Sequence, residues 1–390
     1  MAAETAGSRP SAGGRMLYVD NIRAGLITLV IVGHMAITYG APLGDWYYSE
    51  GEAGPIFSIV ATILLGIGAA FLLQLFFMIS GYFTPRPYDR KGAGAFLLDR
   101  LKRLGIPLVL YALVINPLVV YWAEVHRGFE GTLWQYASTN PSDLTNASVG
   151  PLWFVEALLI FSLAYALGRL LSGRSRGARD LATVPIPGNL SIALFALCVG
   201  LATFVVRIWA PVGWNWEPPH QELAHWPQYV AFFAVGIAAY RRNWFESFPT
   251  ARAKLWRWVA LALVPGLPAL AVAAGALSGE MDARAAGGFS LLSLAYSLWE
   301  GFIGVALVIT VLVWFRNRFN RQGRLLHAMS AASYAVYVLH PLIIVPLALA
   351  LSGIPLDLGL KYLLVAPLAV ACCFLVGHFV RKLPLVRNIL

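Results

Sequence analysis

Three ionisable residues lie in the first apolar stretch of the chain, where a bilayer favours apolar side chains. Asp20, Arg23 and His34 fall within residues 17–40, and no other ionisable group lies between Arg23 and His34. At 100° per residue, Arg23 and His34 lie about 20° apart on a helix and about 16 Å apart along its axis. Asp20 shares this face. Charged groups at such depth usually face a cavity or one another, so we predict a functional site here.

The chemistry open to these residues is proton transfer near a fixed positive charge. A low-dielectric environment favours the neutral imidazole, and its unprotonated nitrogen can accept a proton from a reacting hydroxyl. Arginine stays charged and offers paired donors to a phosphate or carboxylate. The alternative for an isolated His34 is a packing residue with one hydrogen bond. The face that it shares with Asp20 and Arg23 favours a functional role.

Later apolar stretches add ionisable residues towards the predicted outer side. Glu156 ends P-L-W-F-V-E, about two turns below the predicted outer surface. His340 ends Y-A-V-Y-V-L-H, past the middle of its stretch. Arg207 lies near the outer end of one stretch and Glu300 near the middle of another. These two residues could form a structural ion pair, whereas Glu156 and His340 are candidates for the same site as His34.

The predicted inner side carries a basic segment instead. Arg100, Lys102 and Arg103 occur in R-L-K-R, directly before the third apolar stretch. Guanidinium groups suit the phosphates of an anionic ligand. The alternative is that these residues only set the topology and contact lipid head groups.

The elements that must position these residues are membrane-spanning helices. Of the 390 residues, 59% are hydrophobic and 12% are charged, against about 25% charged in soluble chains. Most apolar segments hold about 20 residues, which is enough to cross about 30 Å of hydrocarbon. The sequence predicts an all-α polytopic protein with ten such segments, at 17–40, 56–83, 104–122, 151–171, 190–210, 226–240, 258–278, 290–315, 328–351 and 362–380.

The positions of the Lys and Arg residues support an even number of spans. Arg127, Arg284 and Lys361 lie in predicted outer loops, and Arg23 and Arg207 lie in predicted spans. The rest of the 29 Lys and Arg residues fall in the two tails and the alternate loops. The positive-inside rule therefore places both termini in the cytoplasm. The net charge of +10 then reflects topology and anionic lipid rather than nucleic acid.

The remaining features predict one domain without a metal. Residues 1–15 are predicted to be a flexible cytoplasmic tail without a cleavage signal, and residues 16–390 a single transmembrane domain. The histidines of H-Q-E-L-A-H, at 220–225, would lie about 140° apart on a helix, which does not fit a zinc-protease motif. The sequon at 146–148 matters only in a secretory pathway. Cys198, Cys372 and Cys373 lie in apolar runs and predict no disulfide framework.

Five segments, in order along nearly the whole chain, resemble one family of membrane enzymes. Y-V-D-N-I-R-A-G-L-I-T-L-V-I-V-G-H, at 18–34, is similar to the first-helix signature of the acyltransferase 3 family, D-x-x-R followed by R-x10-H. The other four are L-F-F-M-I-S-G-Y-F (75–83), F-L-L-D-R-L-K-R-L-G-I-P-L (96–108), P-L-W-F-V-E (151–156) and S-Y-A-V-Y-V-L-H-P (333–341). Among subgroups, the chain looks closest to the periplasmic-glucan succinyltransferase-like members.

The resemblance implies a reaction and its partners. An acyl group, acetyl or succinyl, would move from cytoplasmic acyl-CoA to a hydroxyl of an extracytoplasmic carbohydrate or similar acceptor. Acyl-CoA would be the donor co-substrate, with no metal, and the protein would lie in a bacterial inner membrane. The sequence leaves the acyl group, the acceptor and the oligomeric state open.

The resemblance also implies roles for individual residues. His34 would be the catalytic base and Arg23 its motif partner, while Glu156 would orient the imidazole or bind the sugar. The CoA end would contact Arg100, Arg103, Arg23 and Lys102. Supporting positions would be Asp20, His340, Glu300 and Ser80.

Three other classes compete with this interpretation. A proton-coupled secondary transporter could use the same buried His, Arg and Glu residues. A different membrane O-acyltransferase superfamily would make His340, in a late apolar helix, the reactive histidine. A structural or lipid-scaffold protein leaves the buried charges unexplained. The R-x10-H signature in the first stretch favours the acyltransferase 3 interpretation.

Overall fold

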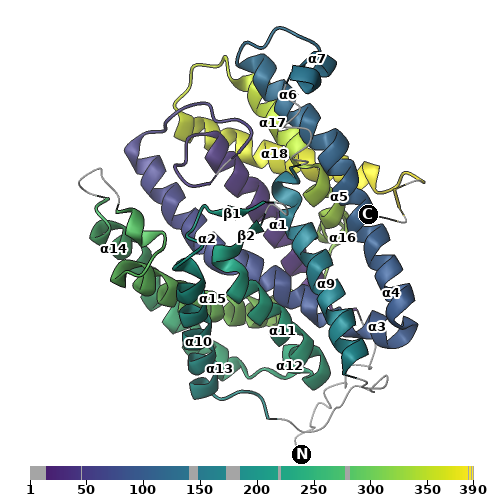
Figure 1. Ribbon diagram of the computed structural model, residues 1–390, viewed down its shortest axis with the longest axis vertical. Coiled ribbons are helices and arrows are strands. Elements are labelled where there is room, and N and C mark those ends of the chain that lie inside the picture. The colour runs from purple at the N-terminus through teal and green to yellow at the C-terminus, as the bar shows by residue number, and fades with distance from the viewer. Residues whose placement is uncertain are drawn as a thin grey trace, which may run out of the picture.

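The computed structural model describes residues 15–44, 46–139, 148–172, 185–217, 221–276, 282–384, 386–387 and 389. Of the predicted tail and sequon, only Arg15 and Ser148 fall within this part. Helices α1 and α2 lie between two groups of helices, one containing α10, α11, α13 and α15 and the other α4 to α6 and α16 to α18 (Figure 1).

Helices make up almost all of the described secondary structure. They are α1 (Leu17–Thr38), α2 (Pro55–Tyr82), α3 (Pro85–Lys91), α4 (Ala93–Arg100), α5 (Ile106–Leu110), α6 (Asn116–His126), α7 (Leu133–Thr139), α9 (Trp153–Leu171), α10 (Asn189–Arg207), α11 (Trp226–Arg242), α12 (Trp244–Ser247), α13 (Thr250–Leu263), α14 (Gly266–Ala273), α15 (Leu291–Arg318), α16 (Arg324–Leu339), α17 (Pro341–Leu351) and α18 (Leu358–Val380). Short 3-10 turns lie at Gly150–Leu152, Leu223–His225 and Ala283–Ala285.

The fold is that of a helical polytopic membrane protein, as predicted. Among the described residues, eight helical segments are long and apolar enough to cross a bilayer, and α16 with α17 makes a ninth if the bent pair is one span. The sixth predicted segment corresponds to α11, which has 17 residues. The count of ten spans therefore stays a prediction. The all-α expectation misses one small hairpin, in which β1 (Asn215–Trp216) pairs antiparallel with β2 (Gln221–Glu222).

The helix that contains the third predicted span begins before residue 104. One helical segment runs from Ala93 to His126 and passes through two π-helical turns, Leu101–Gly105 and Tyr111–Ile115. A proline follows each π-helical turn. Because a proline lacks the N–H donor and its ring crowds the carbonyl four residues earlier, the helix widens at these positions. The carbonyl opposite Pro107 is that of Arg103, and the Tyr334 hydroxyl donates to it at 2.5 Å.

The segment 328–351, predicted as one span, is not straight. Helices α16 and α17 meet at an angle of 70°, and His340 is the residue between them. Pro341 causes this break, since it cannot donate to the carbonyl of Tyr337 and its ring clashes there. The bend places the buried His340 at the break between the two helices rather than along a helix face.

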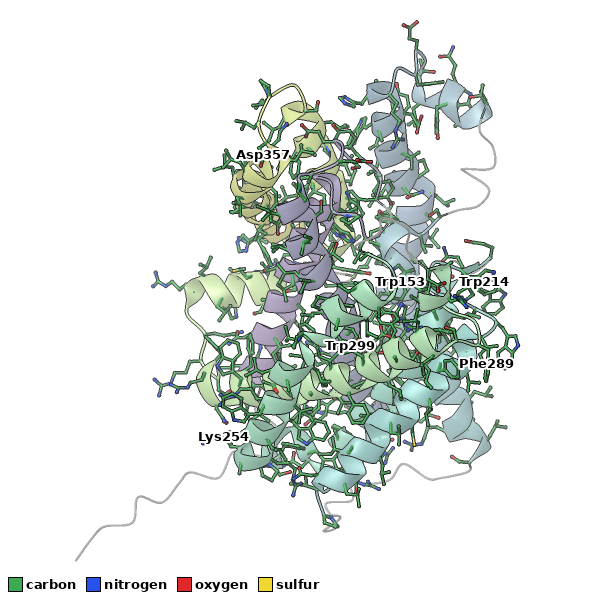
Figure 2. All side chains as sticks on the ribbon, turned by 90° about the vertical axis from the view of Figure 1, so that its left-hand side faces the viewer. Trp153, Trp214, Lys254, Phe289, Trp299 and Asp357 are labelled. Atoms are coloured by element: carbon green, nitrogen blue, oxygen red, sulfur yellow. The ribbon has the colours of Figure 1, made fainter. Side chains whose placement is uncertain are left out.

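Polar contacts join segments that were predicted to lie on the same side of the bilayer. At the inner side, Arg169 pairs with Asp89 at 2.9 Å, and Arg316 donates to the carbonyls of residues 245, 246 and 248. At the outer side, the backbone N–H of Val212 donates to the carbonyl of Ala286. Asp357, from a predicted outer loop, and Lys254, from a predicted inner one, lie at opposite ends of the molecule (Figure 2).

Two glycines allow a close contact between α2 and α11. A Cβ added at Gly81 of α2 would lie 2.1 Å from the carbonyl oxygen of Phe233, and one added at Gly236 of α11 would lie 2.1 Å from that of Met78. The two backbones therefore touch directly, as small residues allow in membrane helices. This contact holds α2 against α11.

Candidate functional site

His34 and His340 form a hydrogen-bonded pair covered by Trp46. The Nδ1 atom of His34 lies 3.1 Å from Nε2 of His340, and the two rings are nearly parallel. The Trp46 ring stacks on His34 with a centroid distance of 3.9 Å. His340 is fully buried. Helix α1, the α16–α17 bend and the loop after α1 thus converge on one imidazole.

The proton positions in this pair follow from the hydrogen bonds. Nδ1 of His340 lies 2.7 Å from the carbonyl oxygen of Tyr337, the carbonyl that Pro341 leaves without its helical donor. A carbonyl only accepts, so this Nδ1 carries the hydrogen, and Nε2 of the neutral ring is an acceptor. His34 must then donate from Nδ1. Its Nε2 keeps the free lone pair and has no hydrogen bond to any described residue, so His34 is oriented as a base.

The loop that carries Trp46 is fixed at several points. Gly40 begins it with φ +91°, and a Cβ there would lie 2.6 Å from the backbone N of Ala53, so the turn needs glycine. The Tyr47 hydroxyl lies 2.7 Å from that of Tyr111 and donates to Asn116 at 2.6 Å. Burial raises the pKa of Tyr47 above its ordinary value, which keeps the phenol protonated as a donor.

A buried ion pair fixes the far end of this loop. The Lys361 ammonium at the start of α18 contacts the Glu50 carboxylate and also donates to the carbonyl of Ile354 at 3.1 Å. The side chain of Lys361 is 1% exposed and that of Glu50 is 12% exposed. A desolvated charge pair of this kind resists separation. Trp46 is therefore part of a fixed cover over His34.

A cavity of about 1200 Å³ opens beside His34. Residues of α1, α2 and the start of α18 form most of its wall, and Trp153 and Tyr337 complete it. The Tyr337 hydroxyl donates to the carbonyl of Pro151, which joins the P-L-W-F-V-E and Y-V-L-H-P segments at the cavity. His34 is the one histidine among the lining residues.

Glu156 is engaged by Gln221 of the β-hairpin. Its Oε2 accepts from the Gln221 Nε2 at 2.6 Å, and the same amide donates to the Trp153 carbonyl at 3.1 Å. Gln221 is fully buried. His340 contacts the His34 imidazole, whereas orienting the imidazole or binding the sugar stays a prediction for Glu156.

Glu300 belongs to a separate buried cluster with Arg207. Their closest N and O atoms are 2.6 Å apart, with 0% and 1% of the side chains exposed. The His225 Nδ1 lies 3.1 Å from Glu300, and Arg207 also donates to Ser297 at 3.3 Å. The structural ion pair that the sequence left open is present. It connects α10, α15 and the start of α11.

The predicted inner residues gather around the end of α2. Arg23 lies 3.5 Å from Asp20 and its guanidinium covers the Phe83 ring at 4.8 Å from the centroid. Arg100 contacts the next residue, since its Nη2 donates to the Thr84 hydroxyl at 3.4 Å. Arg23 and Arg100 thus contact two consecutive residues of the chain. Two guanidinium groups thus flank one helix end, which is an arrangement suited to an anion.

The other predicted inner positions are less enclosed. Lys102 and Arg103 are exposed side chains on the continuous helix. Ser80, whose carbonyl accepts from the Thr84 hydroxyl at 2.7 Å, lies one turn above this end of α2. The structure therefore brings Arg23 and Arg100 together but leaves His34 at the other end of α1.

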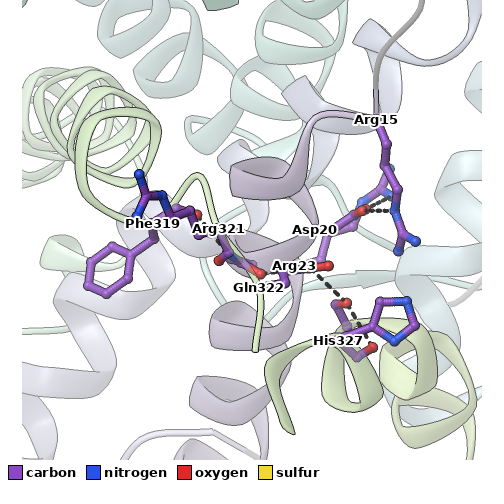
Figure 3. A network of polar contacts seen from close by, with 9 residues as sticks. Arg15, Asp20, Arg23, Phe319, Arg321, Gln322 and His327 are labelled. Atoms are coloured by element: carbon purple, nitrogen blue, oxygen red, sulfur yellow. Dashed lines mark hydrogen bonds and ion pairs between the residues drawn. The ribbon is translucent and has the colours of Figure 1, made fainter. Parts of the chain in front are cut away.

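A polar network fastens the inner end of α1 to α16 (Figure 3). Asn21 donates to the carbonyls of Phe319 and Arg321 at 2.6 and 3.0 Å, and Gln322 donates back to Asn21 at 2.8 Å. Arg15 donates to Asp20 at 2.6 Å. Gln322 also donates to the Ser330 hydroxyl of α16 at 3.1 Å, so both helices that bring histidines to the site are joined at their inner ends as well.

Sequence reasoning missed Trp46 and the contact between His34 and His340. Trp46 lies in a loop with no motif, and nothing in its neighbours indicates stacking. The dipeptide His340–Pro341 was a usable signal, because a proline frees a carbonyl four residues earlier. In the described part of the chain, no group of three His, Cys, Asp or Glu side chains could bind a metal ion.

Comparison with known proteins places the chain in a family. The acyltransferase domain model matches residues 16–378. Glucans biosynthesis protein C of Escherichia coli is 23% identical over 201 residues, which cover 51% of this chain and 50% of that protein. The Salmonella schwarzengrund protein of the same name is 30% identical over 199 residues, covering 50% and 49%. The match thus spans about half the length of these relatives.

No solved structure matches the chain. The family model nevertheless covers almost all of it, including the segments that contribute His34, Arg100, Glu156 and His340. The chain therefore belongs to the acyltransferase 3 family.

Proposed function

We propose that the protein is an O-acyltransferase of a bacterial inner membrane. It transfers an acyl group, acetyl or succinyl, from cytoplasmic acyl-CoA to a hydroxyl of an extracytoplasmic glycan. The family supports acyl transfer, and two relatives are named for glucan biosynthesis. The observation that carries the proposal is the His34 imidazole, whose Nε2 is free beside a cavity while His340 occupies its Nδ1.

The chemistry proposed for His34 is general-base catalysis. Its Nε2 takes the proton of the acceptor hydroxyl as that oxygen attacks the thioester carbonyl carbon. The new C–O bond forms, the C–S bond breaks, and the departing CoA thiolate takes the proton back from the imidazolium. The products are an ester and free CoA. His340 keeps Nε2 of His34 unprotonated before the step and accepts a stronger hydrogen bond from the imidazolium during it.

The donor would bind with its phosphates at the inner end of α2. Arg23 and Arg100 flank Phe83 and Thr84 there, and the exposed Lys102 and Arg103 extend the positive surface. Cations at this end and a base at the other end of α1 suit a donor and an acceptor that arrive from opposite sides of the membrane.

The test follows a labelled acyl group. Purified protein in vesicles receives acyl-labelled acetyl-CoA or succinyl-CoA together with a glucan acceptor. We expect label in the glucan, and a loss of about 10²–10⁴-fold in kcat for His34→Ala. His126→Ala, at an exposed histidine, is the matched control and retains activity.

Two results would contradict the proposal. A folded His34→Ala variant with full transfer would remove the base from the mechanism. Glucan uptake without covalent change and without acyl-CoA would indicate the proton-coupled transporter instead.

A further inference from the structure

The cavity beside His34 is long and follows the membrane-spanning direction. Its α2 wall runs from Ile56 to Leu73, which is about 25 Å of helix. The hydrocarbon core of a bilayer is about 30 Å thick. The cavity therefore extends over most of that core, whereas His34 lies only one turn from the outer end of α1 at Thr38.

The wall of the cavity offers few hydrogen-bond partners. Its polar side chains are His34, Trp153, Tyr337, Asp357 and Tyr362. Tyr337 already donates to Pro151, and Asp357 already accepts from the backbone N–H of Leu360 at 3.0 Å. A sugar in this space would lose its hydrogen bonds to water without replacement. The interior of the cavity therefore suits an apolar chain.

The rim of the cavity lies at the lipid-facing surface. Three lining side chains remain largely exposed: Ile56 at 81%, Leu64 at 63% and Leu363 at 66%. They belong to α2 and α18, two of the segments that can cross the membrane. A molecule that is already in the bilayer can enter between these helices without crossing water.

We propose that this cavity binds the apolar chain of a membrane lipid whose head group carries the acceptor hydroxyl. The inference rests on the proposed acyl transfer and names the acceptor as a lipid-linked or lipid-anchored glycan. With its chain along α2, such a lipid places its head group at the outer end of the cavity, level with His34.

An acyl chain of the donor fits the cavity less well. The Arg100 contact at Thr84 lies eleven residues beyond Leu73 on the α2–α3 segment, or about 16 Å if helical. A donor held there approaches His34 from the inner end. The cavity instead opens to the lipid and ends at Gly54, Pro55 and Asp357, which belong to predicted outer loops or helix ends.

Two glycines give a matched pair of variants. Gly68 lines the cavity, and a Cβ added to it meets no atom within 4 Å. Gly68→Phe therefore fills the cavity without displacing protein atoms near the backbone. Gly168 of α9 has the same open surroundings and is not among the cavity residues, so Gly168→Phe controls for a new phenylalanine in a helix.

The experiment compares two acceptors that share one head group. Full-length protein in phosphatidylglycerol vesicles receives labelled acetyl-CoA with either a glucosyl-diacylglycerol or water-soluble methyl glucoside. We expect kcat/KM to be at least about tenfold higher for the glycolipid, since each methylene that fits an apolar site contributes to discrimination. Gly68→Phe should reduce the glycolipid reaction by about tenfold or more and leave methyl glucoside within about twofold, whereas Gly168→Phe changes neither.

Photocrosslinking tests the same inference without catalysis. A glucosyl-diacylglycerol with a diazirine in its acyl chain should label α1, α2 or α18, and Gly68→Phe should lose that label. Equal use of both acceptors, or absence of this crosslink, would overturn the inference even if acyl transfer occurs. The inference would also fail if Gly68→Phe affected the reaction only when palmitoyl-CoA replaced acetyl-CoA as the donor, because the cavity would then bind the acyl chain of the donor. A wild-type protein that crosslinks the lipid but transfers no label would instead contradict the proposed function.

Discussion

Replacing His340 by two different amides separates its hydrogen bonds to His34 and to Tyr337. His340 donates from Nδ1 to the Tyr337 carbonyl and accepts at Nε2 from His34. Glutamine can present an acceptor where Nε2 lies, whereas asparagine reaches only the Nδ1 position. His340→Gln therefore keeps the contact that orients His34. His340→Asn keeps the contact to Tyr337 and removes the other one.

The size of the effect follows from the lost partner. In His340→Asn, the buried Nδ1–H of His34 has no acceptor in the reactive orientation, which costs about 1–3 kcal/mol. Each 1.36 kcal/mol is a factor of ten in rate, so kcat should fall about 5- to 150-fold. His340→Gln should lose less than about fivefold. KM for acyl-CoA should stay within about twofold in both variants, since the inner basic residues are untouched.

The assay combines kcat with the tautomer of His34. Selective ¹⁵N-histidine labelling reports which ring nitrogen carries the hydrogen, and the His34 signal is identified by its absence in His34→Ala. We expect the Nδ1–H form in the wild type and in His340→Gln, and a mixture in His340→Asn. Equal losses of kcat in both variants with an unchanged tautomer would reduce His340 to a packing residue and refute the reasoning.

Two further predictions concern the buried charges. Lys361→Met leaves Glu50 unpaired and frees the loop that carries Trp46, so kcat should fall about tenfold and proteolysis of that loop should increase. The Lys361→Met/Glu50→Gln double variant should recover part of the loss, and unchanged cleavage of the loop in Lys361→Met would contradict this anchoring. Arg207→Met should lower the free energy of unfolding by about 3–5 kcal/mol, because the Glu300 carboxylate is left buried without the Arg207 charge. The Arg207→Met/Glu300→Met double variant should restore stability in thermal unfolding and retain kcat. A stable but inactive double variant would make the pair catalytic.

The sequence was most informative where one helix determines the geometry. The spacing of Asp20, Arg23 and His34 on α1 required only the helical repeat, and the Asp20–Arg23 ion pair lies where that repeat places it. The approximate positions of the apolar helices also followed from hydropathy. Their ends did not, because the segment before residue 104 is amphipathic and continues as helix from Ala93.

Contacts between distant segments could not be read in the same way. His34 and His340 are 306 positions apart, and their meeting depends on a 70° bend that hydropathy does not report. Trp46 reaches the site through a loop fixed by Tyr111, Asn116 and Lys361, three residues on other elements. Without these tertiary contacts, the sequence named Glu156 as a candidate to orient the imidazole and His340 only as a supporting position.

Helix α16 contacts both the segment proposed to bind the donor and the histidine that orients the base. Each contact uses a backbone carbonyl whose helical N–H donor is replaced by a proline. Past the middle of this helix, Tyr334 donates to the Arg103 carbonyl, which Pro107 leaves without its helical donor. One turn further, the Tyr337 carbonyl, released by Pro341, accepts from His340. The same helix therefore contacts the basic segment proposed to bind the donor and the histidine that orients the base.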